Sequence, residues 1–397
     1  MIMINPKEAQ QLILDNTNSL ESAIITVEDT LGFILAENIK APISLPPFRQ
    51  SAMDGYAVAI DENFAENDSL TIVGEIKAGA NTIPEIKSNE AVRIFTGAPV
   101  PESANTVVMQ EHTEVDGNKL SFTREINLFA NIRDVGSAIK KDVLALVKGQ
   151  VINPGAIGLL KSLGLEKLNV IKKPIISVIA TGDELIESGN PLGVGQIYES
   201  NSDTIIAALK QSQFNDCKGQ KVKDDFEQTK KSIASALEQS DVVILSGGIS
   251  VGDYDFVGVA LEKLGVETIF YKINQKPGKP MFFGKKDDKL VFALPGNPAA
   301  ALSCMYEYVI PALKKMSGFT NVLLSSMELK STNYFSSKAK RNQFLKAKVN
   351  ENGVEILDGQ NSHVLASFAE ANALVYLSEE KGNVKKGDFV ETHLLPS

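Results

Sequence analysis

Short apolar runs that alternate with helical patterns are the feature that most limits the fold of this 397-residue chain. Three of the runs are Ile175–Ala180, Val242–Leu245 and Leu290–Leu294. Runs without polar alternation are typical of strands buried on both faces, and strand–helix alternation is typical of a parallel sheet covered by helices. The intervening helical patterns lie at Asp203–Gln211, Phe226–Leu237 and Phe256–Leu264, and a longer one runs from Pro298 to Met316. The sequence therefore predicts a doubly wound α/β domain over residues 175–317.

Loops rich in glycine and proline adjoin the predicted strands. They are Thr181-Gly182-Asp183-Glu184-Leu185, Ser246-Gly247-Gly248, Lys276-Pro277-Gly278-Lys279-Pro280 and Leu294-Pro295-Gly296-Asn297-Pro298. Ligands of open α/β sheets bind outside the carboxyl ends of the strands. We therefore expect the four loops to gather at one mouth.

The residue types in these loops suit an anion. Gly247 and Gly248 lack Cβ atoms, so the backbone can adopt positive φ and bring N–H groups close to a phosphate. Asn297 is a good N-cap and Pro298 suits the first helical position, which predicts a helix N-terminus able to receive a phosphate or oxyanion. The two lysines of the Pro-Gly loop add point charges.

Carboxylates accompany these loops. Asp183, Glu184 and Asp255 offer the hard oxygens that Mg²⁺ prefers while it keeps waters and binds substrate phosphates. Each loop taken alone is also consistent with a simple tight turn. Their concentration at predicted strand ends favours a phosphate-and-metal site.

Composition excludes several classes of function. The formal net charge of −9 argues against a nucleic-acid-binding protein, whose binding face is normally basic. Cys217 and Cys304 lie far apart, so neither a disulfide framework nor a thiolate zinc site is expected. All three histidines lie outside the four loops, which argues against a Ser-His-Asp mechanism or a histidine-built metal centre. They are His112, His363 and His393.

The N-terminal sequence has no basic region ahead of a long apolar core, and no later segment approaches a membrane span. We therefore expect a cytoplasmic protein with no membrane partner.

The remainder of the chain predicts helical and β regions on either side of the α/β domain. Helices are expected at Pro6–Asp15, Val27–Glu37 and Pro154–Leu163, and Asp116-Gly117 predicts a β-hairpin. We expect a helical and linker domain from residues 1–55 and 134–174, an inserted β domain at 56–133 and a C-terminal β domain at 318–397. The Thr96–Pro101 loop of the inserted domain is either a structural turn, which is favoured, or a second ligand-facing edge.

Basic residues cluster early in the C-terminal domain, at Lys338, Lys340, Arg341 and Lys346. Such a cluster is usually a solvated face, and it is also a candidate anion contact.

Six motifs in one order give the chain a resemblance to a known family. They are Ser51-Ala52-Met53-Asp54-Gly55-Tyr56-Ala57, Thr96-Gly97-Ala98-Pro99, Thr181-Gly182-Asp183-Glu184-Leu185, Ser246-Gly247-Gly248, Lys276-Pro277-Gly278-Lys279-Pro280 and Pro295-Gly296-Asn297-Pro298. Over nearly its whole length the chain resembles the molybdopterin molybdenumtransferase family, which includes the C-terminal part of gephyrin.

The resemblance implies an elongated four-domain homodimer with a pterin-binding α/β domain, an inserted β domain and a C-terminal β-barrel-like domain. The implied reaction is Mg²⁺-dependent: adenylylated molybdopterin and molybdate yield molybdenum cofactor and AMP. The active site would lie at the subunit interface, where Asp54 of one subunit faces the pterin domain of the other. The adenylyltransferase of the same pathway is a further expected partner.

The resemblance also assigns roles to single residues. Glu184, Asp224 and Asp255 would serve metal and substrate positioning, with Glu184 and Asp255 as the metal ligands. Lys272, Lys276 and Arg341 would contact the anions. From the residues alone, simpler roles stay open: Asp54 suits a turn before Gly55, and Asp224 and Asp255 could each cap the helix that follows.

The chain departs from the family pattern at three places. Gly136-Ser137-Ala138 follows Arg133 where the family usually has Gly-Glu-Asp, so an expected acidic residue is missing. Arg49 stands near a position that is commonly acidic, and Lys346 replaces a frequent arginine. These changes bear on activity, metal affinity and substrate preference.

Two other functions are compatible with parts of the chain. A molybdopterin adenylyltransferase resembles the Ile175–Met316 region alone, and the Asp54 motif and full-length match argue against it. A gephyrin-like scaffold would present a groove to a partner peptide, but the chain lacks an appended domain or long linker for clustering.

Overall fold

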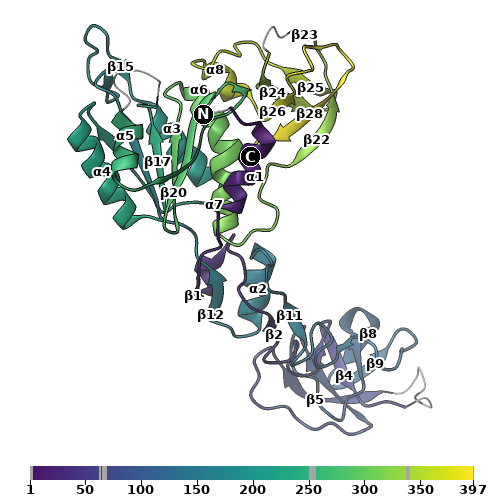
Figure 1. Cartoon of the computed structure of the whole chain (residues 1–397). Coiled ribbons are helices and arrows are strands. Elements are labelled where there is room, and N and C mark those ends of the chain that lie inside the picture. Colours follow the sequence, from purple (N-terminus) through teal and green to yellow (C-terminus); the bar gives the residue numbers. More distant parts are fainter. Residues whose placement is uncertain (1–2, 62–63, 65–68, 250–255, 337–339, 397) are drawn as a thin grey trace. The chain divides into compact units, whose positions relative to one another are not determined.

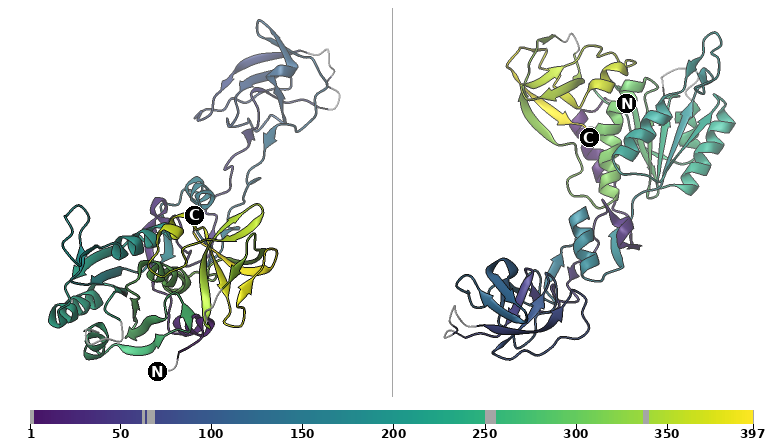
Figure 2. Two further views of the ribbon diagram at one scale, coloured as in Figure 1. Left: turned by 90° about the horizontal axis from the view of Figure 1, so that it is seen from above. Right: turned by 180° about the vertical axis from the view of Figure 1, so that it is seen from behind.

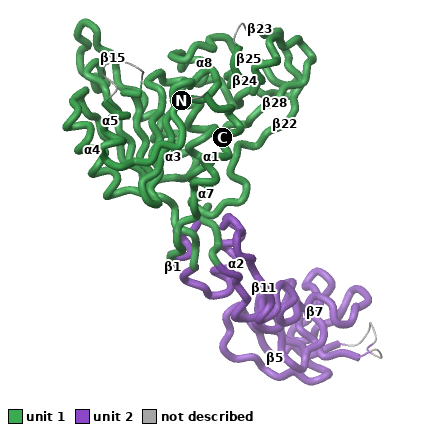
Figure 3. The backbone as a smooth tube through the Cα atoms, in the orientation of Figure 1, with its two compact units in different colours: residues 1–24, 32–36, 169–397 green, residues 25–31, 37–168 purple. Residues whose placement is uncertain are grey.

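The computed structural model describes residues 3–61, 64, 69–249, 256–336 and 340–396 (Figure 1). The chain divides into two compact units (Figure 3). Unit 1 comprises residues 1–24, 32–36 and 169–397, and unit 2 comprises residues 25–31 and 37–168. Strands β1 (Ser22–Thr26) and β12 (Lys167–Ile171) span the unit boundaries in the sequence.

A six-stranded mixed sheet forms the centre of unit 1, in the order β16-β13-β17-β21-β20-β18. The first four strands run parallel to one another, whereas β20 pairs antiparallel with both β21 and β18. Their bounds are β16 (Cys217–Val222), β13 (Ile176–Thr181), β17 (Val242–Ser246), β21 (Lys289–Leu294), β20 (Pro280–Lys286) and β18 (Glu267–Lys272). The pairing aligns Thr181 with Val222, and Ser246 with Leu294, so four carboxyl ends lie at one edge.

Helices cover both faces of this sheet (Figure 2). On one face, Val178, Ile244 and Phe292 share a core with helix α3 and the long helix that begins at Pro298. On the other, Ile179 and Val243 share a second core with α4 and α5. The helices are α3 (Asn201–Gln211), α4 (Phe226–Gln239), α5 (Phe256–Lys263), α6 (Pro298–Cys304) and α7 (Ile310–Met316), with α1 (Pro6–Asp15) on the α7 side. The predicted doubly wound α/β domain is confirmed.

The predicted helix Pro298–Met316 contains an irregular turn. Between α6 and α7 the chain forms a π-helical turn, η3 (Met305–Val309), which is fully buried. Turns of this kind are rare in proteins, and a large share of those that occur lie at functional sites. Its side chains reach two parts of unit 1, as described below.

The C-terminal part of unit 1 is a second sheet in the order β19-β24-β26-β28-β22, with β25 paired to β24. Its strands are β19 (Gln275–Lys276), β24 (Asn342–Asn350), β26 (Ala373–Leu377), β28 (Phe389–Leu394), β22 (Ser326–Lys330) and β25 (Gly353–Ile356). Short elements accompany it and the first sheet: the pair β23 (Phe335–Ser336) and β27 (Asn383–Val384), helix α8 (Ala366–Glu370), and the pair β14 (Leu185–Ile186) and β15 (Ile197–Tyr198). Through β19, the Lys276–Pro280 loop is joined to the C-terminal sheet.

Unit 2 contains a six-stranded sheet in the order β7-β4-β6-β5-β9-β8. The strands are β7 (Thr106–Met109), β4 (Gly55–Val58), β6 (Glu90–Ile94), β5 (Leu70–Ile76), β9 (Lys119–Phe122) and β8 (Thr113–Asp116). Smaller elements are β2 (Ile39–Lys40) with β11 (Leu144–Leu146), β3 (Gln50–Ser51) with β10 (Ile132–Arg133), the 3₁₀ turns η1 (Val27–Thr30) and η2 (Gln110–His112), and α2 (Pro154–Ser162). The β8–β9 hairpin confirms the turn predicted at Asp116-Gly117.

One predicted helix is wrong. Residues 27–37 form only the η1 turn, after which Gly32 adopts φ +74° and Leu35 makes an isolated bridge to Val170. The spacing of Leu31, Ile34 and Leu35 imitates a helical face, but the left-handed glycine ends the turn. The predicted helices Pro6–Asp15 and Pro154–Leu163 are confirmed within one residue.

Candidate functional site

A cavity of about 610 Å³ lies at the carboxyl edge of the first sheet. Residues from all four glycine- and proline-rich loops line it, together with one residue of β15 and one from the loop after β16. The lining residues are Thr181, Gly182, Glu184, Ile197, Asp224, Gly247, Gly248, Ile249, Pro280, Pro295, Gly296 and Asn297. The expectation that the loops meet at one mouth is therefore confirmed.

The Gly247-Gly248 loop packs against the end of β13. Both glycines have positive φ, +90° and +66°. A Cβ added to Gly247 would lie 2.7 Å from the Thr181 carbonyl oxygen, and one added to Gly248 would lie 2.7 Å from Val257 Cγ2. No side chain fits at either position, so the backbone of this loop itself faces the cavity.

The hydroxyl of Thr181 lies beneath this loop without a hydrogen-bond partner among the described residues. Thr181 is 6% exposed and lines the cavity. Buried hydroxyl groups are normally hydrogen-bonded. A ligand oxygen in the cavity would supply the missing partner.

Asn201, the first residue of α3, is a site residue that the sequence reasoning missed. Its Nδ2 donates to Ser246 Oγ and to the Gly296 carbonyl, at 2.8 Å each. It thereby ties the loop after β17 to the loop after β21. The only sequence signal was an asparagine at a helix start, where a capping role is the ordinary interpretation.

Two carboxylates line the cavity, those of Glu184 and Asp224. Burial raises the pKa of Asp224, and the neighbouring carboxylates of Glu184 and Asp183 raise it further, against one hydrogen bond from the Asp183 N–H. Asp224 is not the cap of α4, because Asp225 accepts the capping bond from Gln228 N at 2.8 Å. The alternative role that the sequence left open for Asp224 is therefore wrong.

These carboxylates fit a divalent cation. Within the part of the chain that the structure describes, no three His, Cys, Asp or Glu side chains form a metal cluster, and Asp255 lies outside that part. Mg²⁺ is commonly held by one or two protein carboxylates, with waters and substrate phosphates completing the shell. A cation beside Glu184 and Asp224 would also relieve the repulsion that raises the pKa of Asp224.

Several predicted site residues are not among those that line the cavity. Lys272 ends β18, Lys276 and Lys279 are exposed beside it in sequence, and Arg341 is half-buried just before β24. Ser246 is buried beneath the cavity, Asp183 bonds the backbone N–H of Asp224 at 3.2 Å, and Pro298 begins α6.

The predicted capping role of the Asn297 side chain is wrong. It donates instead to Ser362 Oγ at 3.0 Å, and makes no capping hydrogen bond. The Ser362 carbonyl accepts from the N–H groups of Ala299 and Ala300, at 3.1 and 3.3 Å. Ser362, which is distant in sequence, therefore accepts the hydrogen bonds of N–H groups at the start of α6.

The loop that carries Ser362 is held by a buried lysine. Lys346 is 2% exposed, and its ammonium donates to the carbonyls of Gly359 at 2.6 Å and Val364 at 2.9 Å. Burial lowers the pKa of Lys346 to about 8. This basic residue is thus an internal support of the loop beside Asn297 rather than part of a solvated face.

In unit 2, the Asp54 motif and the Thr96 loop come together. Asp54 Oδ1 accepts from the Thr96 N–H at 2.8 Å and from its hydroxyl at 2.9 Å. The backbone hydrogen bond is the largest cause of a lowered pKa at Asp54, and the hydroxyl bond is the next. The positive charge of Arg93 lowers this pKa further. Arg93 itself lies over the rings of Tyr56 and Phe95, at 5.1 and 5.0 Å. Asp54 is exposed, so an ionised carboxylate is presented to solvent.

Arg49 has a structural role in this unit. Its guanidinium donates to the carbonyls of Pro101 at 3.3 Å and Ala104 at 2.9 Å, and so holds the loop after β6. The departure from an acidic residue is therefore accommodated by local hydrogen bonds. Ala138 lies in a backbone pairing in which its N–H donates to the Leu45 carbonyl at 2.9 Å.

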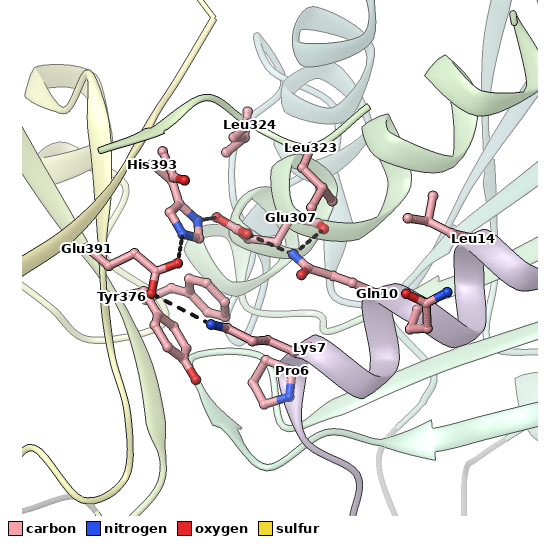
Figure 4. A pocket seen from close by; sticks show the side chains of 13 residues that line it. Pro6, Lys7, Gln10, Leu14, Glu307, Leu323, Leu324, Tyr376, Glu391 and His393 are labelled. Atoms are coloured by element: carbon pink, nitrogen blue, oxygen red, sulfur yellow. Dashed lines mark hydrogen bonds and ion pairs between the residues drawn. The ribbon is translucent and has the colours of Figure 1, made fainter. Parts of the chain in front are cut away.

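A second cavity of about 340 Å³ lies in unit 1 between α1, the π-helical turn and strands β26 and β28 (Figure 4). His393 bonds Glu307 at 2.8 Å through Nδ1 and Glu391 at 3.2 Å through Nε2. Gln10 Nε2 also donates to Glu307, at 3.2 Å, and Lys7 lies 3.9 Å from Glu391. The charged groups here are largely matched within the chain, so the first cavity is the stronger candidate for a catalytic site.

The fold and the first cavity together define a class: multidomain α/β proteins that can receive an anionic ligand and a divalent cation at the carboxyl edge of a parallel sheet. Family models match three consecutive parts of the chain. Residues 4–164 match the MoeA N-terminal region (domain I and II), residues 177–315 match a "Probable molybdopterin binding domain", and residues 328–395 match the MoeA C-terminal region (domain IV).

Curated relatives extend over nearly the whole chain. A protein of Haemophilus influenzae named molybdopterin molybdenumtransferase is 34% identical over 386 residues, which is 93% of each chain. One of Staphylococcus aureus with the same name is 32% identical over 98% of this chain and 95% of the relative. The crystal structure of a molybdopterin biosynthesis moeA protein from Pyrococcus horikosii covers 100% of both chains, with a TM-score of 0.81 and 29% identity. The chain belongs to the MoeA family of molybdopterin molybdenumtransferases.

Proposed function

We propose that this protein transfers molybdenum from molybdate to adenylylated molybdopterin, releasing AMP and giving molybdenum cofactor. The observation that carries the proposal is the cavity in which a glycine loop, an orphan hydroxyl and two carboxylates meet at one sheet edge. Full-length similarity to relatives named molybdopterin molybdenumtransferase supports the choice of reaction.

The backbone of Gly247-Gly248 and the Thr181 hydroxyl are assigned to the phosphate oxygens of the substrate. Both groups are able to donate hydrogen bonds to a ligand oxygen, and both line the cavity. Gly182, Pro295 and Gly296 complete the wall of the cavity. Preorganised donors of this kind stabilise charge that develops at a reacting phosphate.

Glu184 and Asp224 would hold Mg²⁺, with Asp255 as a third carboxylate assigned from the sequence. When bound, the cation would neutralise charge on the phosphoanhydride as it breaks. Asp183 and Asp224 each donate a backbone N–H to the carboxylate of the other, at 3.4 and 3.2 Å, which fixes the loop on which Glu184 lies beside Asp224.

The proposal also includes a homodimer in which Asp54 of one protomer faces the cavity of its partner. Lys272, Lys276, Lys279 and Arg341 are assigned to the anions, and the protein is assigned to the cytoplasm. The four-domain division at residues 55/56, 133/134, 174/175 and 317/318 remains part of this proposal. Among the residues that the structure describes, no helix has the length and apolar character needed to cross a bilayer.

We further propose that molybdenum insertion and AMP release are coupled. The soft dithiolene sulfurs of the pterin would capture molybdenum while an oxygen of molybdate or of water attacks the phosphate. The attack falls on the adenylyl phosphorus, whose bond to the bridging anhydride oxygen breaks; the pterin keeps its own phosphate as the leaving group, AMP carries the attacking oxygen, and no protein nucleophile is required. Equal rates of AMP release with and without molybdate would contradict the coupling.

A molybdopterin adenylyltransferase and a gephyrin-like scaffold are the competing functions. Family models that match residues 4–164 and 328–395 favour the transferase, because a single α/β domain would account for neither region. Incubation with ATP and molybdopterin tests the first alternative, because an adenylyltransferase would give robust adenylylation of molybdopterin. Recovery of a partner protein other than the chain itself in a pull-down would favour the second.

The test is a defined assay with purified protein, adenylylated molybdopterin, molybdate and Mg²⁺. We expect AMP and molybdenum cofactor to appear in equal amounts, and both to fall when Mg²⁺ is chelated. An intact protein that binds the adenylylated pterin but releases no AMP would overturn the proposal.

A further inference from the structure

The Lys276–Lys279 turn rests on a buried polar network that no motif predicted. Gln275 is completely buried, and its side-chain nitrogen donates to the Pro277 carbonyl in the middle of the turn, at 3.0 Å. The same nitrogen lies 3.6 Å from Cys304 Sγ. The Tyr308 hydroxyl donates to Gln275 Oε1 from the other side. One glutamine therefore connects the turn to the π-helical turn of the long helix.

The turn packs directly on this network. Gly278 has φ +88°, and an added Cβ would lie 2.6 Å from Cys304 Sγ and 2.8 Å from Gln275 Nε2. The turn is closed at its base by a bond of 3.0 Å from Ile273 N to the Lys279 carbonyl. The backbone of residues 273–279 is thus fixed at its base and at its centre.

The two lysines of the turn are free to bind a ligand. Both are exposed, and neither has an ion-pair partner within 4.0 Å among the residues that the structure describes. Pro280, the next residue after the turn, lines the first cavity. Two uncommitted ammonium groups therefore extend from a rigid turn that leads directly into the wall of that cavity.

These contacts give the buried side-chain amide of Gln275 a role. Lysine side chains are flexible, so the direction in which they present charge depends on the backbone that carries them. We propose that Gln275, held by Tyr308, is a positioning residue that sets the turn from which Lys276 and Lys279 meet the anionic substrate; this inference rests on the function proposed above.

The long helix supplies a matched control. Tyr308 and Tyr306 lie in the same π-helical turn, and each hydroxyl donates to a glutamine. The partner of Tyr308 is Gln275, whereas the partner of Tyr306 is Gln211 of α3, at 3.0 Å. Replacing either tyrosine by phenylalanine removes one similar hydrogen bond, but only Tyr308→Phe touches the network under the lysines.

The experiment measures kcat and KM for adenylylated molybdopterin in the full-length protein, with thermal midpoints in parallel. We expect Gln275→Met to raise KM about tenfold, the factor that corresponds to roughly one buried hydrogen bond, with kcat little changed. Tyr308→Phe should raise KM in the same direction, and Tyr306→Phe should leave it unchanged. Isothermal titration with inorganic molybdate provides a binding readout that does not depend on turnover.

The double variant Gln275→Met with Tyr308→Phe separates positioning from folding. Removing both partners of a buried hydrogen bond costs less stability than leaving one unpaired. The thermal midpoint should therefore recover relative to Gln275→Met while KM stays high. If KM recovers together with the midpoint, or if Gln275→Met has the wild-type KM, Gln275 has no positioning role. A wild-type protein that releases no AMP would instead contradict the proposed function.

Discussion

Asp54 and Thr96, 42 residues apart in the sequence, are joined by two hydrogen bonds to the same carboxylate oxygen. The bonds come from the backbone and the hydroxyl of Thr96, so the loop after β6 recognises the ionised form of the aspartate. A turn aspartate would bond its own loop. The structure thus connects two motifs that the sequence presents separately.

Replacing Thr96 by valine should raise the pKa of Asp54, because one of the two bonds that lower it is lost. In the wild-type protein the lowered pKa keeps Asp54 ionised in the folded state. The stability that the ionised carboxylate contributes is lost only as the pH falls through that pKa. If the carboxylate is required, the acid limb of the activity profile should move toward neutral pH in the variant. Carboxyl NMR titration measures the pKa directly. Thr113→Val, which removes a hydroxyl that bonds the Gln110 carbonyl, should leave it unchanged.

Replacing Asp224 by asparagine should stabilise the metal-free protein near neutral pH. A carboxyl pKa raised by burial and by neighbouring carboxylates means that stability is complete at low pH and declines as the pH rises through that pKa. The amide removes this decline. Mg²⁺ should raise the thermal midpoint of the wild type more than that of the variant.

Asp225→Ala is the comparison for Asp224→Asn. It removes the cap of α4 and should cost about 1 kcal/mol, with the response to Mg²⁺ retained. Equal Mg²⁺ responses in Asp224→Asn and the wild type would show that Asp224 does not contact the cation.

Replacing Gly248 by alanine should lower the free energy of unfolding by roughly 2 kcal/mol and abolish substrate binding. The new Cβ would lie 2.7 Å from Val257 Cγ2 and 2.9 Å from the Thr181 hydroxyl, at φ +66°. Urea denaturation and titration with AMP measure the two effects. Gly158→Ala, on the exposed face of α2 with no atom within 4 Å of the new Cβ, should instead stabilise by about 0.5–1 kcal/mol.

Replacing His393 by glutamine should remove a pH-dependent part of the stability. Burial lowers the pKa of His393, but the carboxylates of Glu307 and Glu391 more than offset this, so the pKa is raised. The contribution is therefore complete below the ordinary histidine pKa of about 6.5 and is lost as the pH rises through the folded value.

Urea midpoints at pH 6 and pH 9 test this. We expect the wild-type midpoint to fall over this interval more than that of His393→Gln, which should be less stable at pH 6 by roughly 2 kcal/mol. His363→Gln, at an exposed position, should follow the wild type. If the stability of His393→Gln depended on pH as that of the wild type does, the contacts of His393 with Glu307 and Glu391 would not be the source of that dependence.

The sheet edge could be predicted because its signal is local. Three apolar runs end at Thr181, Ser246 and Leu294, and parallel pairing brings these ends together with the end of the more polar edge strand β16 at Val222. The place of the Gly247-Gly248 loop could be predicted for the same reason. Its close packing against β13 leaves no room for a side chain, which accounts for the two glycines.

Other parts of the site depend on contacts that no local pattern encodes. Asn201 reaches residues 45 and 95 positions away, and Ser362 reaches Asn297 across 65. In both cases an ordinary polar residue acquires its role from tertiary packing. The helix expected at residues 27–37 failed for a related reason: Leu35 packs in a bridge to Val170, and the resulting apolar spacing resembles a helical face.

The π-helical turn at Met305–Val309 holds one residue more per turn than the helices on either side. Glu307 reaches Gln10 and His393, while its neighbour Tyr308 reaches Gln275. A wide turn of this kind accommodates one additional residue while the helix on either side keeps its buried face, so Ile310, Leu313 and Met316 of α7 remain in the core. The consecutive residues Glu307 and Tyr308 can therefore belong to two separate hydrogen-bond networks without disturbing the packing of α7.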